Sequence, residues 1–154
     1  LEWLQQRAYH AADRASLRVS DFARVPPEAA GELTFDLHPS LGVLSSRFPI
    51  VSIWRTNSFD EVVQPIDLAM GGQDALVLRP TLDVEILQLP QGALRFISSL
   101  AEGHDLATAS RLACACEPAL MLQPAIAALI EMGAFVECRL GRCRIQPQKG
   151  ESLS

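Results

Sequence analysis

Four cysteines, Cys114, Cys116, Cys138 and Cys143, are the residues of this chain whose chemistry could serve a metal site or a disulfide. A Cys-x-Cys pair on a helix directs its sulfur atoms about 200° apart, which suits tetrahedral zinc poorly, and the chain contains no Cys-x2-Cys knuckle. We therefore predict no metal site and no cofactor. Cys138 and Cys143 flank a predicted turn and could approach each other across a hairpin, although a reducing cytoplasm disfavours a disulfide.

The three histidines, His10, His38 and His104, form no Cys-His-acid or His-x3-His arrangement. No Walker loop, dinucleotide-binding glycine pattern or serine elbow is present either, so we predict a protein that is not an enzyme. A hydrolytic or metal-dependent enzyme is a third possibility behind two binding functions. His38 stands out because it begins a bend at Pro39. It is either a structural turn residue or part of a binding surface.

Charge and hydropathy exclude further classes. The chain has 154 residues, 49% of them apolar, and a formal charge of −5, and residues 74–131 contain three arginines against seven acids. Such a field repels polyanions, so nucleic acid and anionic membranes are not expected partners. No apolar run approaches the roughly 18 residues of a membrane span, and we expect a cytoplasmic protein. The first residues already look helical, so we expect a further domain upstream.

Residues 1–73 are predicted to form a mostly helical region. Apolar residues recur at helical spacing over 1–14, a second short helix is expected over 16–25, and alternation predicts a strand over 33–37. Ser40 could then cap a short helix that runs to Ser46.

Pro49 suits the first turn of another helix. A strand over 48–53 stays open as the alternative, because this segment is rich in β-branched residues. Gly71-Gly72 indicates a loop, and we place a domain boundary after residue 73.

Residues 74–147 are predicted to form a winged-helix-like domain, which makes the chain an α+β protein. The expected elements are strands over 75–79 and 83–89, helices over 91–102, 106–116 and 119–132, and strands over 135–140 and 143–145. The third helix contains no lysine or arginine, and its one charged residue is Glu131. Residues 148–154 are predicted to be a flexible tail.

Three segments form a recognisable set: Leu1-Glu2-Trp3 with residues 8–13, Leu37-His38-Pro39-Ser40-Leu41, and the Arg-Phe-Pro-Ile-Val-Ser-Ile-Trp-Arg-Thr-Asn run over 47–57. Together they resemble a bacterial family named for a DNA-binding domain and also called the HvfC/BufC type. The resemblance covers nearly the whole chain. It implies a non-catalytic partner of a multinuclear iron-dependent oxidative enzyme that modifies cysteine-containing ribosomal peptides.

The closing half also resembles the peptide-recognition winged helix of ribosomal peptide pathways, mainly in layout. In such a domain an extended peptide adds as a strand beside a helix. For the enzyme-binding face we predict His38, Ser40, Trp54 and Arg55. For contacts to the precursor's leader peptide we predict Leu122, Gln123, Ile126, Phe135 and Glu137.

The alternative function is a winged-helix transcriptional regulator that binds DNA. It would require Arg139, Arg142, Arg144 and Lys149 to form a basic wing, with an affinity that falls steeply as salt rises.

Overall fold

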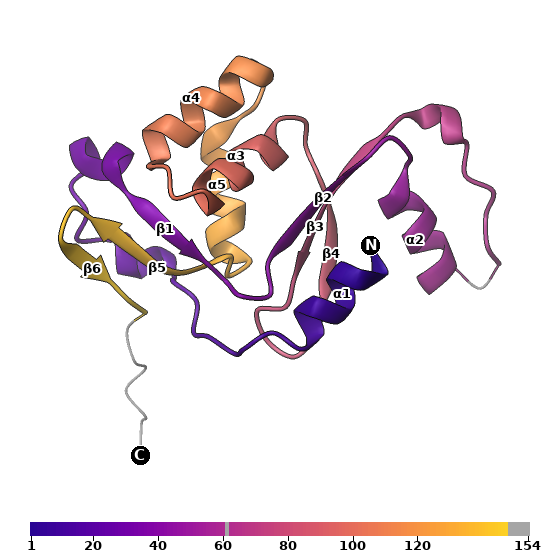
Figure 1. Cartoon of the computed structure of the whole chain (residues 1–154), viewed down its shortest axis with the longest axis horizontal. Helices are drawn as coiled ribbons and strands as arrows, with labels where there is room; N and C mark the ends of the chain where they lie inside the picture. The colour runs from indigo at the N-terminus through magenta and orange to yellow at the C-terminus, as the bar shows by residue number, and fades with distance from the viewer. Residues whose placement is uncertain (61, 148–154) are drawn as a thin grey trace.

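The computed structural model describes residues 1–60 and 62–147, and within them it shows an α+β architecture of five α-helices, three 3-10 helices and two three-stranded antiparallel sheets (Figure 1). The α+β class predicted from the sequence is confirmed. The predicted tail, residues 148–154, lies outside the described residues. No helix in the described part of the chain is long and apolar enough to cross a membrane.

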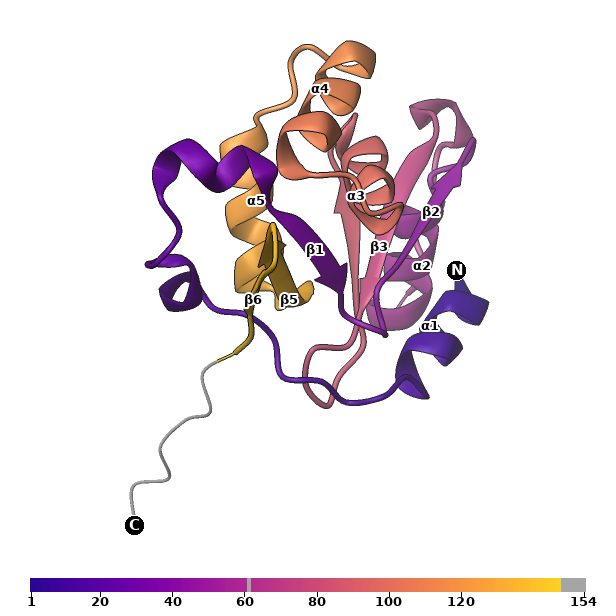
Figure 2. The same ribbon diagram turned by 60° about the vertical axis from the view of Figure 1, so that its left-hand side comes forward.

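The first sheet has the order β2-β3-β4, with β2 over Gly42–Ser46, β3 over Gln73–Leu78 and β4 over Glu85–Leu89. Side chains of successive strand residues point to opposite faces. Leu76 of β3 therefore packs into the larger core with Phe96, whereas Val77 packs against Leu4 and Ala8 of α1, Glu2–Tyr9. Figure 2 shows α1 and α2 on one side of this sheet and α3 and α5 on the other.

Three helices cover the larger core: α3 over Ala93–Ala101, α4 over Leu106–Cys116 and α5 over Leu122–Glu131. All three predicted helices are confirmed: α4 has its predicted bounds, and the ends of α3 and α5 shift by one to three residues. Asp105 caps α4, because its Oδ1 accepts a hydrogen bond from the N–H of Thr108 at 2.7 Å. That bond is the main reason why the pKa of Asp105 lies below its usual value.

The second sheet has the order β1-β5-β6, with β1 over Thr34–Leu37, β5 over Phe135–Leu140 and β6 over Cys143–Ile145. Phe35 and Phe135 stack in the core with their ring centres 4.5 Å apart. In both sheets a strand from residues 1–73 pairs with a strand from residues 74–147, or with one that spans their boundary. The two predicted regions therefore share their sheets and one hydrophobic core.

The helix predicted over 40–46 is wrong, because this segment is strand β2. Its residues pair along their whole length with β3, which begins 27 residues later at Gln73, and that long-range pairing overrides the local capping signal of Ser40. The helix expected from Pro49 is confirmed as α2, Ile50–Phe59. The alternative strand over 48–53 does not form.

Gln73 explains how α2 begins. Its Oε1 accepts hydrogen bonds from the N–H groups of Val51 and Ser52, each at 3.0 Å. These are among the first N–H groups of the helix, which have no partner within it. A residue at the start of β3 therefore fixes the start of α2. Three 3-10 helices, Val19–Phe22, Pro27–Glu32 and Leu68–Met70, complete the described elements.

Candidate functional site

An apolar cavity of about 580 Å³ lies between β4 and α5, and we call it the β4–α5 groove. Leu87 and Leu89 form the β4 wall, Ala125 and Ala128 form the α5 wall, and Phe96 lies at the floor. Among its described lining residues only Glu117 is ionisable. The groove therefore suits an apolar ligand rather than a phosphate.

The alternation of β4 creates one wall of this groove. Ile86 packs with Leu4, Ala8 and Val77 in a second, smaller core on the α1 side of the sheet. Its neighbour Leu87 must therefore face the opposite side, where 38% of its surface stays exposed. β4 is also the last strand of its sheet in the described part of the chain. Its outer row of N–H and C=O groups is thus available to an extended peptide.

Small residues form the opposite wall. Ala125 and Ala128 are three positions apart on α5 and lie on the same face of the helix. Leu129 beside them is buried in the core and anchors the helix. Two methyl groups in place of larger side chains leave room for bulky side chains of a bound peptide.

A close contact joins two segments that border the groove. Gly92 begins α3 with a φ of 81°, and a Cβ atom added there would lie 2.7 Å from Cβ of Glu117. Only glycine fits this conformation and this contact without strain. The turn that follows α4 can therefore pack directly on the start of α3.

The residues predicted to contact a leader peptide lie elsewhere. Leu122 and Ile126 are half-buried and pack on the larger core, and Gln123 is exposed, but none of these three lines the groove. The α5 residues of the groove lie on the neighbouring face of the helix. The sequence features that could have indicated the groove are Leu87-Gln88-Leu89 at the end of a strand and the small residues Ala125 and Ala128, three positions apart on the third helix.

Phe135 and Glu137 have a structural role instead. They are 1% and 4% exposed, and their strand β5 already has a neighbour on each edge, β1 and β6. A peptide could not reach them without breaking a sheet. The prediction that Phe135 and Glu137 contact a leader peptide is therefore wrong, because both are buried within the β1-β5-β6 sheet.

The predicted enzyme-binding residues are also separated. His38 and Ser40 are 2% and 1% exposed, so neither can form a contact surface. Trp54 is half-buried against the second core, with its ring centre 5.2 Å from that of Phe59. Arg55 is exposed on α2. The prediction therefore fails for His38 and Ser40, which belong to an internal network.

That network joins three distant parts of the chain. Oγ of Ser40 lies 2.7 Å from Nδ1 of His38 and accepts a hydrogen bond from the N–H of Arg79 at 2.8 Å. Nε2 of His38 lies 3.2 Å from the carbonyl oxygen of Arg14, so it carries the proton and Nδ1 is the acceptor. Burial lowers the pKa of His38, although the Arg14 carbonyl opposes this effect.

The side chain of Arg79 completes the network beneath α1. Its guanidinium donates to the carbonyl oxygens of Ala8 at 3.0 Å, Ala11 at 2.6 Å and Thr81 at 2.8 Å, and it pairs with Asp13 at 2.9 Å. The carbonyls at the end of a helix lack partners within it. Arg79 provides hydrogen-bond donors to the carbonyl groups of Ala8 and Ala11 at this end of α1. No local pattern in the sequence predicted this role.

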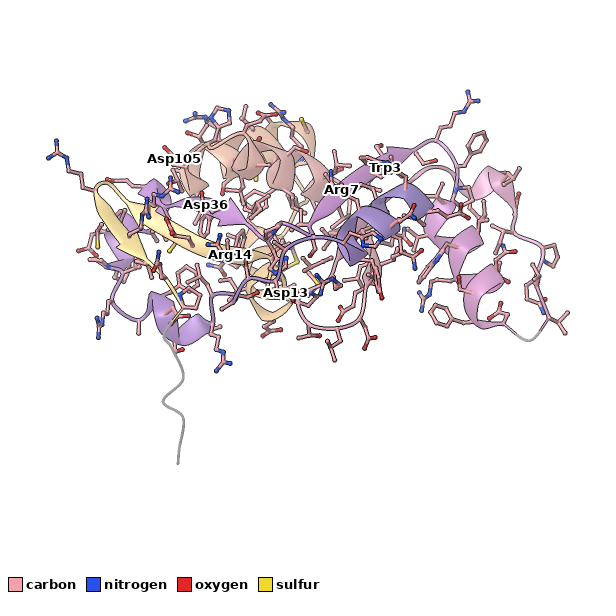
Figure 3. All side chains as sticks on the ribbon, turned by 60° about the horizontal axis from the view of Figure 1, so that its bottom comes forward. Trp3, Arg7, Asp13, Arg14, Asp36 and Asp105 are labelled. Carbon is pink, nitrogen blue, oxygen red and sulfur yellow. The ribbon has the colours of Figure 1, made fainter. Side chains whose placement is uncertain are left out.

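Two side chains of α1, Trp3 and Arg7, are labelled in Figure 3. Arg7 of α1 lies over the ring of Trp3 at 5.4 Å and donates to the carbonyl oxygen of Leu41 at 2.9 Å. This bond ties α1 to the start of β2. The first helix is therefore held in place by Arg7, which bonds to Leu41, and at its C-terminal end by Arg79.

The arginines of the β5–β6 hairpin are largely neutralised by acids. Arg139 pairs with Asp36 and with Glu137, and Nε of Arg144 lies 3.1 Å from the same Glu137 carboxylate. Hydrogen bonds from Gln146 and Arg139 hold the pKa of Glu137 below its usual value. Arg142 remains exposed at the turn, and Lys149 lies outside the described residues.

The four cysteines are free thiols. Cys138 is buried in β5, and burial raises its pKa to about 11, so it is not a reactive thiolate at neutral pH. Within residues 1–60 and 62–147, no three His, Cys, Asp or Glu side chains come together in a way that could hold a metal ion.

Comparison of the chain with protein-family models, curated proteins and solved structures finds no match.

Proposed function

We propose that this protein is a non-catalytic adaptor that holds a cysteine-containing ribosomal precursor peptide by its leader segment and presents it to a multinuclear iron-dependent oxidative enzyme. The leader binds as an added strand along β4, with alternate side chains in the β4–α5 groove. One observation carries this proposal: an apolar groove lies directly beside the unpaired edge of a strand.

The arrangement of the elements supports the proposal. The β3–β4 hairpin, the helices α3, α4 and α5, and the β5–β6 hairpin follow one another in the order of a winged helix. We propose that the domain is of this type and uses its groove for peptide. The α5 helix has no cation to offer to phosphate, whereas Ala125 and Ala128 offer van der Waals contact to apolar side chains.

The first test places a charge in the groove. A fluorescein-labelled leader peptide of the proposed cysteine-containing precursor is titrated with wild type, Ala128→Glu and Ala127→Glu. Both alanines are exposed neighbours on α5, but only Ala128 lines the groove. We expect Ala128→Glu to weaken binding at least about tenfold, or about 1.4 kcal/mol, and Ala127→Glu to leave it within about twofold.

The second test examines the strand pairing. Two leader peptides carry N-methyl groups on alternate residues, one on the odd and one on the even positions. Alternate N–H groups of an added strand point toward β4, so only one of these peptides should lose binding. Equal binding of both methylated peptides, or equal loss for both alanine variants, contradicts the proposed mode.

A further inference from the structure

The one ionisable side chain among the described residues of the β4–α5 groove lies near the C-terminal end of β4. β4 ends at Leu89, and the N–H of Ala93 donates to the carbonyl oxygen of Pro90 at 3.1 Å, which makes a tight turn into α3. Gly92 belongs to this turn, and a Cβ atom added to it would lie 2.7 Å from Cβ of Glu117. Glu117 therefore gives the groove a polarity, because the walls around Leu87 and Ala128 are apolar.

The carboxylate of Glu117 has no cationic partner in the described part of the chain. Its Oε1 accepts a hydrogen bond from the N–H of Ala119 at 3.2 Å. None of the ion pairs within residues 1–60 and 62–147 includes it. A carboxylate at the border of an apolar cavity gains most from a cation that the ligand brings, because a charge-assisted hydrogen bond is stronger where less water competes.

The surroundings of Glu117 leave its negative charge in place. Glu117 is the C-cap of α4, whose end carries about half a negative charge, and it lies beside the start of α3, which carries about half a positive charge. These partial charges offset each other. The three arginines within residues 74–131 have other partners: Arg79 bonds to Asp13, Arg95 to Glu102 and Arg111 to Thr108.

Strand pairing converts the position of Glu117 into a sequence pattern. Opposed residues of neighbouring strands point to the same face of a sheet, so peptide residues opposite Leu87 and Leu89 place their side chains in the groove. The next position on that face is opposite Gln91, which lines the groove and precedes Gly92. A long side chain at this position can reach Glu117.

The direction of the peptide follows from the sheet. All strand pairs in the described residues are antiparallel, and parallel pairing is slightly less stable per residue. A peptide that runs antiparallel to β4 meets the end of β4 first and its start last. The residue beside Glu117 is therefore N-terminal to the residues beside Leu89 and Leu87.

We propose that the β4–α5 groove recognises an extended segment with the pattern basic-x-apolar-x-apolar, read from its N-terminus, where x is any residue. The basic residue, arginine or lysine, pairs with Glu117, and the two apolar side chains lie against Leu89 and Leu87. This inference rests on the proposed function, because it places the segment in the leader peptide. It adds to that function a direction and a charge that the leader must have.

Synthetic peptides test this pattern by fluorescence anisotropy. The parent probe is Ser-Arg-Thr-Leu-Thr-Leu-Ser, with fluorescein at its N-terminus and an amide at its C-terminus. In two further probes glutamine or glutamate replaces the arginine, and a fourth probe has the reversed sequence. All are titrated with the full chain at about 150 mM salt, which screens the general attraction between an acidic protein and a basic peptide.

Three variants of the protein locate the charge. Glu117→Gln removes it, while the amide oxygen can still accept the hydrogen bond from the Ala119 N–H. Glu117→Lys reverses it. Glu131→Gln is the matched control, because it changes the net charge as Glu117→Gln does, at an exposed position of α5 that does not line the groove. Circular dichroism and urea unfolding check that each variant is folded.

We expect wild type to bind the arginine probe at least about threefold more tightly than the glutamine probe and about tenfold more tightly than the glutamate probe. The reversed probe should bind at least about threefold more weakly than the parent. Glu117→Gln should lose the preference for arginine over glutamine, and Glu117→Lys should prefer the glutamate probe. Glu131→Gln should behave as wild type.

The outcomes separate this inference from the proposed function. If Glu117→Gln keeps the wild-type preference, if the reversed probe binds as tightly as the parent, or if no probe binds wild type at about 1 mM, the pattern is wrong. Binding of the leader peptide that Ala128→Glu weakens would then still support the adaptor. If the probes behave as expected but the leader peptide does not bind, the groove reads this pattern in another peptide, and the proposed function is wrong.

Discussion

The hydroxyl oxygen of Ser40 lies within hydrogen-bond distance of the main-chain N–H and carbonyl oxygen of Arg79, while its single proton is directed to Nδ1 of His38. Oγ of Ser40 accepts a hydrogen bond from the Arg79 N–H at 2.8 Å and lies 3.2 Å from the Arg79 carbonyl oxygen. The two residues are 39 positions apart, and both are buried. This bridge joins the bend after β1 to the end of β3, and so it connects the two sheets.

Replacement of Ser40 by alanine should destabilise the protein by about 1–3 kcal/mol, because it leaves the buried N–H of Arg79 without a partner. The matched control is Ser45→Ala, at an exposed position of β2, which should change the free energy of unfolding by less than about 0.5 kcal/mol. Urea unfolding followed by circular dichroism measures both. Equal stability of the two variants would show that the bridge contributes nothing.

The Arg79 side chain should stabilise the fold mainly through its hydrogen bonds to main-chain carbonyl groups, and its ion pair with Asp13 should contribute little. Arg79→Gln removes the donors to Ala8, Ala11 and Thr81 from a side chain that is 9% exposed, and we expect a loss of about 3 kcal/mol. Asp13→Asn should cost less than about 0.5 kcal/mol, because Asp13 is 88% exposed and water screens its ion pair. Thermal and urea unfolding of both variants decide the point; similar losses would contradict it.

His38 should make the stability of the fold depend on pH. Burial lowers its pKa in the folded state below the usual 6.5, so the unfolded chain binds the proton more readily. Its contribution is complete above pH 6.5 and declines as pH falls from there toward the lowered pKa. Protonation of Nδ1 also removes the acceptor of the Ser40 N–H.

The measurement combines an NMR titration of the His38 ring with urea unfolding between pH 7.5 and pH 5. We expect a ring pKa below 6.5 and a stability that falls with pH. His38→Asn should flatten this dependence, whereas His104→Gln, at an exposed position, should leave it unchanged. A His38 ring that titrates at or above 6.5 would refute the prediction.

The sequence predicted the elements whose signals are local. The Asp105 cap, the Gly103 stop and the helical spacing of Leu94, Ile97 and Leu100 are enough to place α3 and α4. The strand β2 was missed because its evidence is the distant partner β3, and its local signal, Ser40 before a short apolar run, equally suits a capped helix.

The sequence predicted an apolar surface beside a strand edge, but it did not predict which residues line the groove. A third helix without lysine or arginine beside a strand edge led to the prediction of a peptide groove, but helical spacing alone could not show that Ala125 and Ala128 line the groove in place of Leu122 and Ile126. That choice depends on how far α5 is rotated against the sheet. His38 and Ser40 were misplaced for a similar reason, since Arg79, a residue far along the chain, buries them.

Binding to duplex DNA distinguishes the adaptor function from that of a transcriptional regulator. Asp36 and Glu137 together compensate the charges of Arg139 and Arg144, so in the described part of the β5–β6 hairpin Arg142 alone has no acidic partner. One free cation is far fewer than the several phosphate contacts that give measurable affinity at physiological salt. We expect no binding of a labelled promoter duplex to micromolar protein at 150 mM salt by fluorescence anisotropy. Binding that weakens steeply with salt and disappears in Arg142→Ala and Arg144→Ala would favour the regulator, because only a basic wing would respond to both changes.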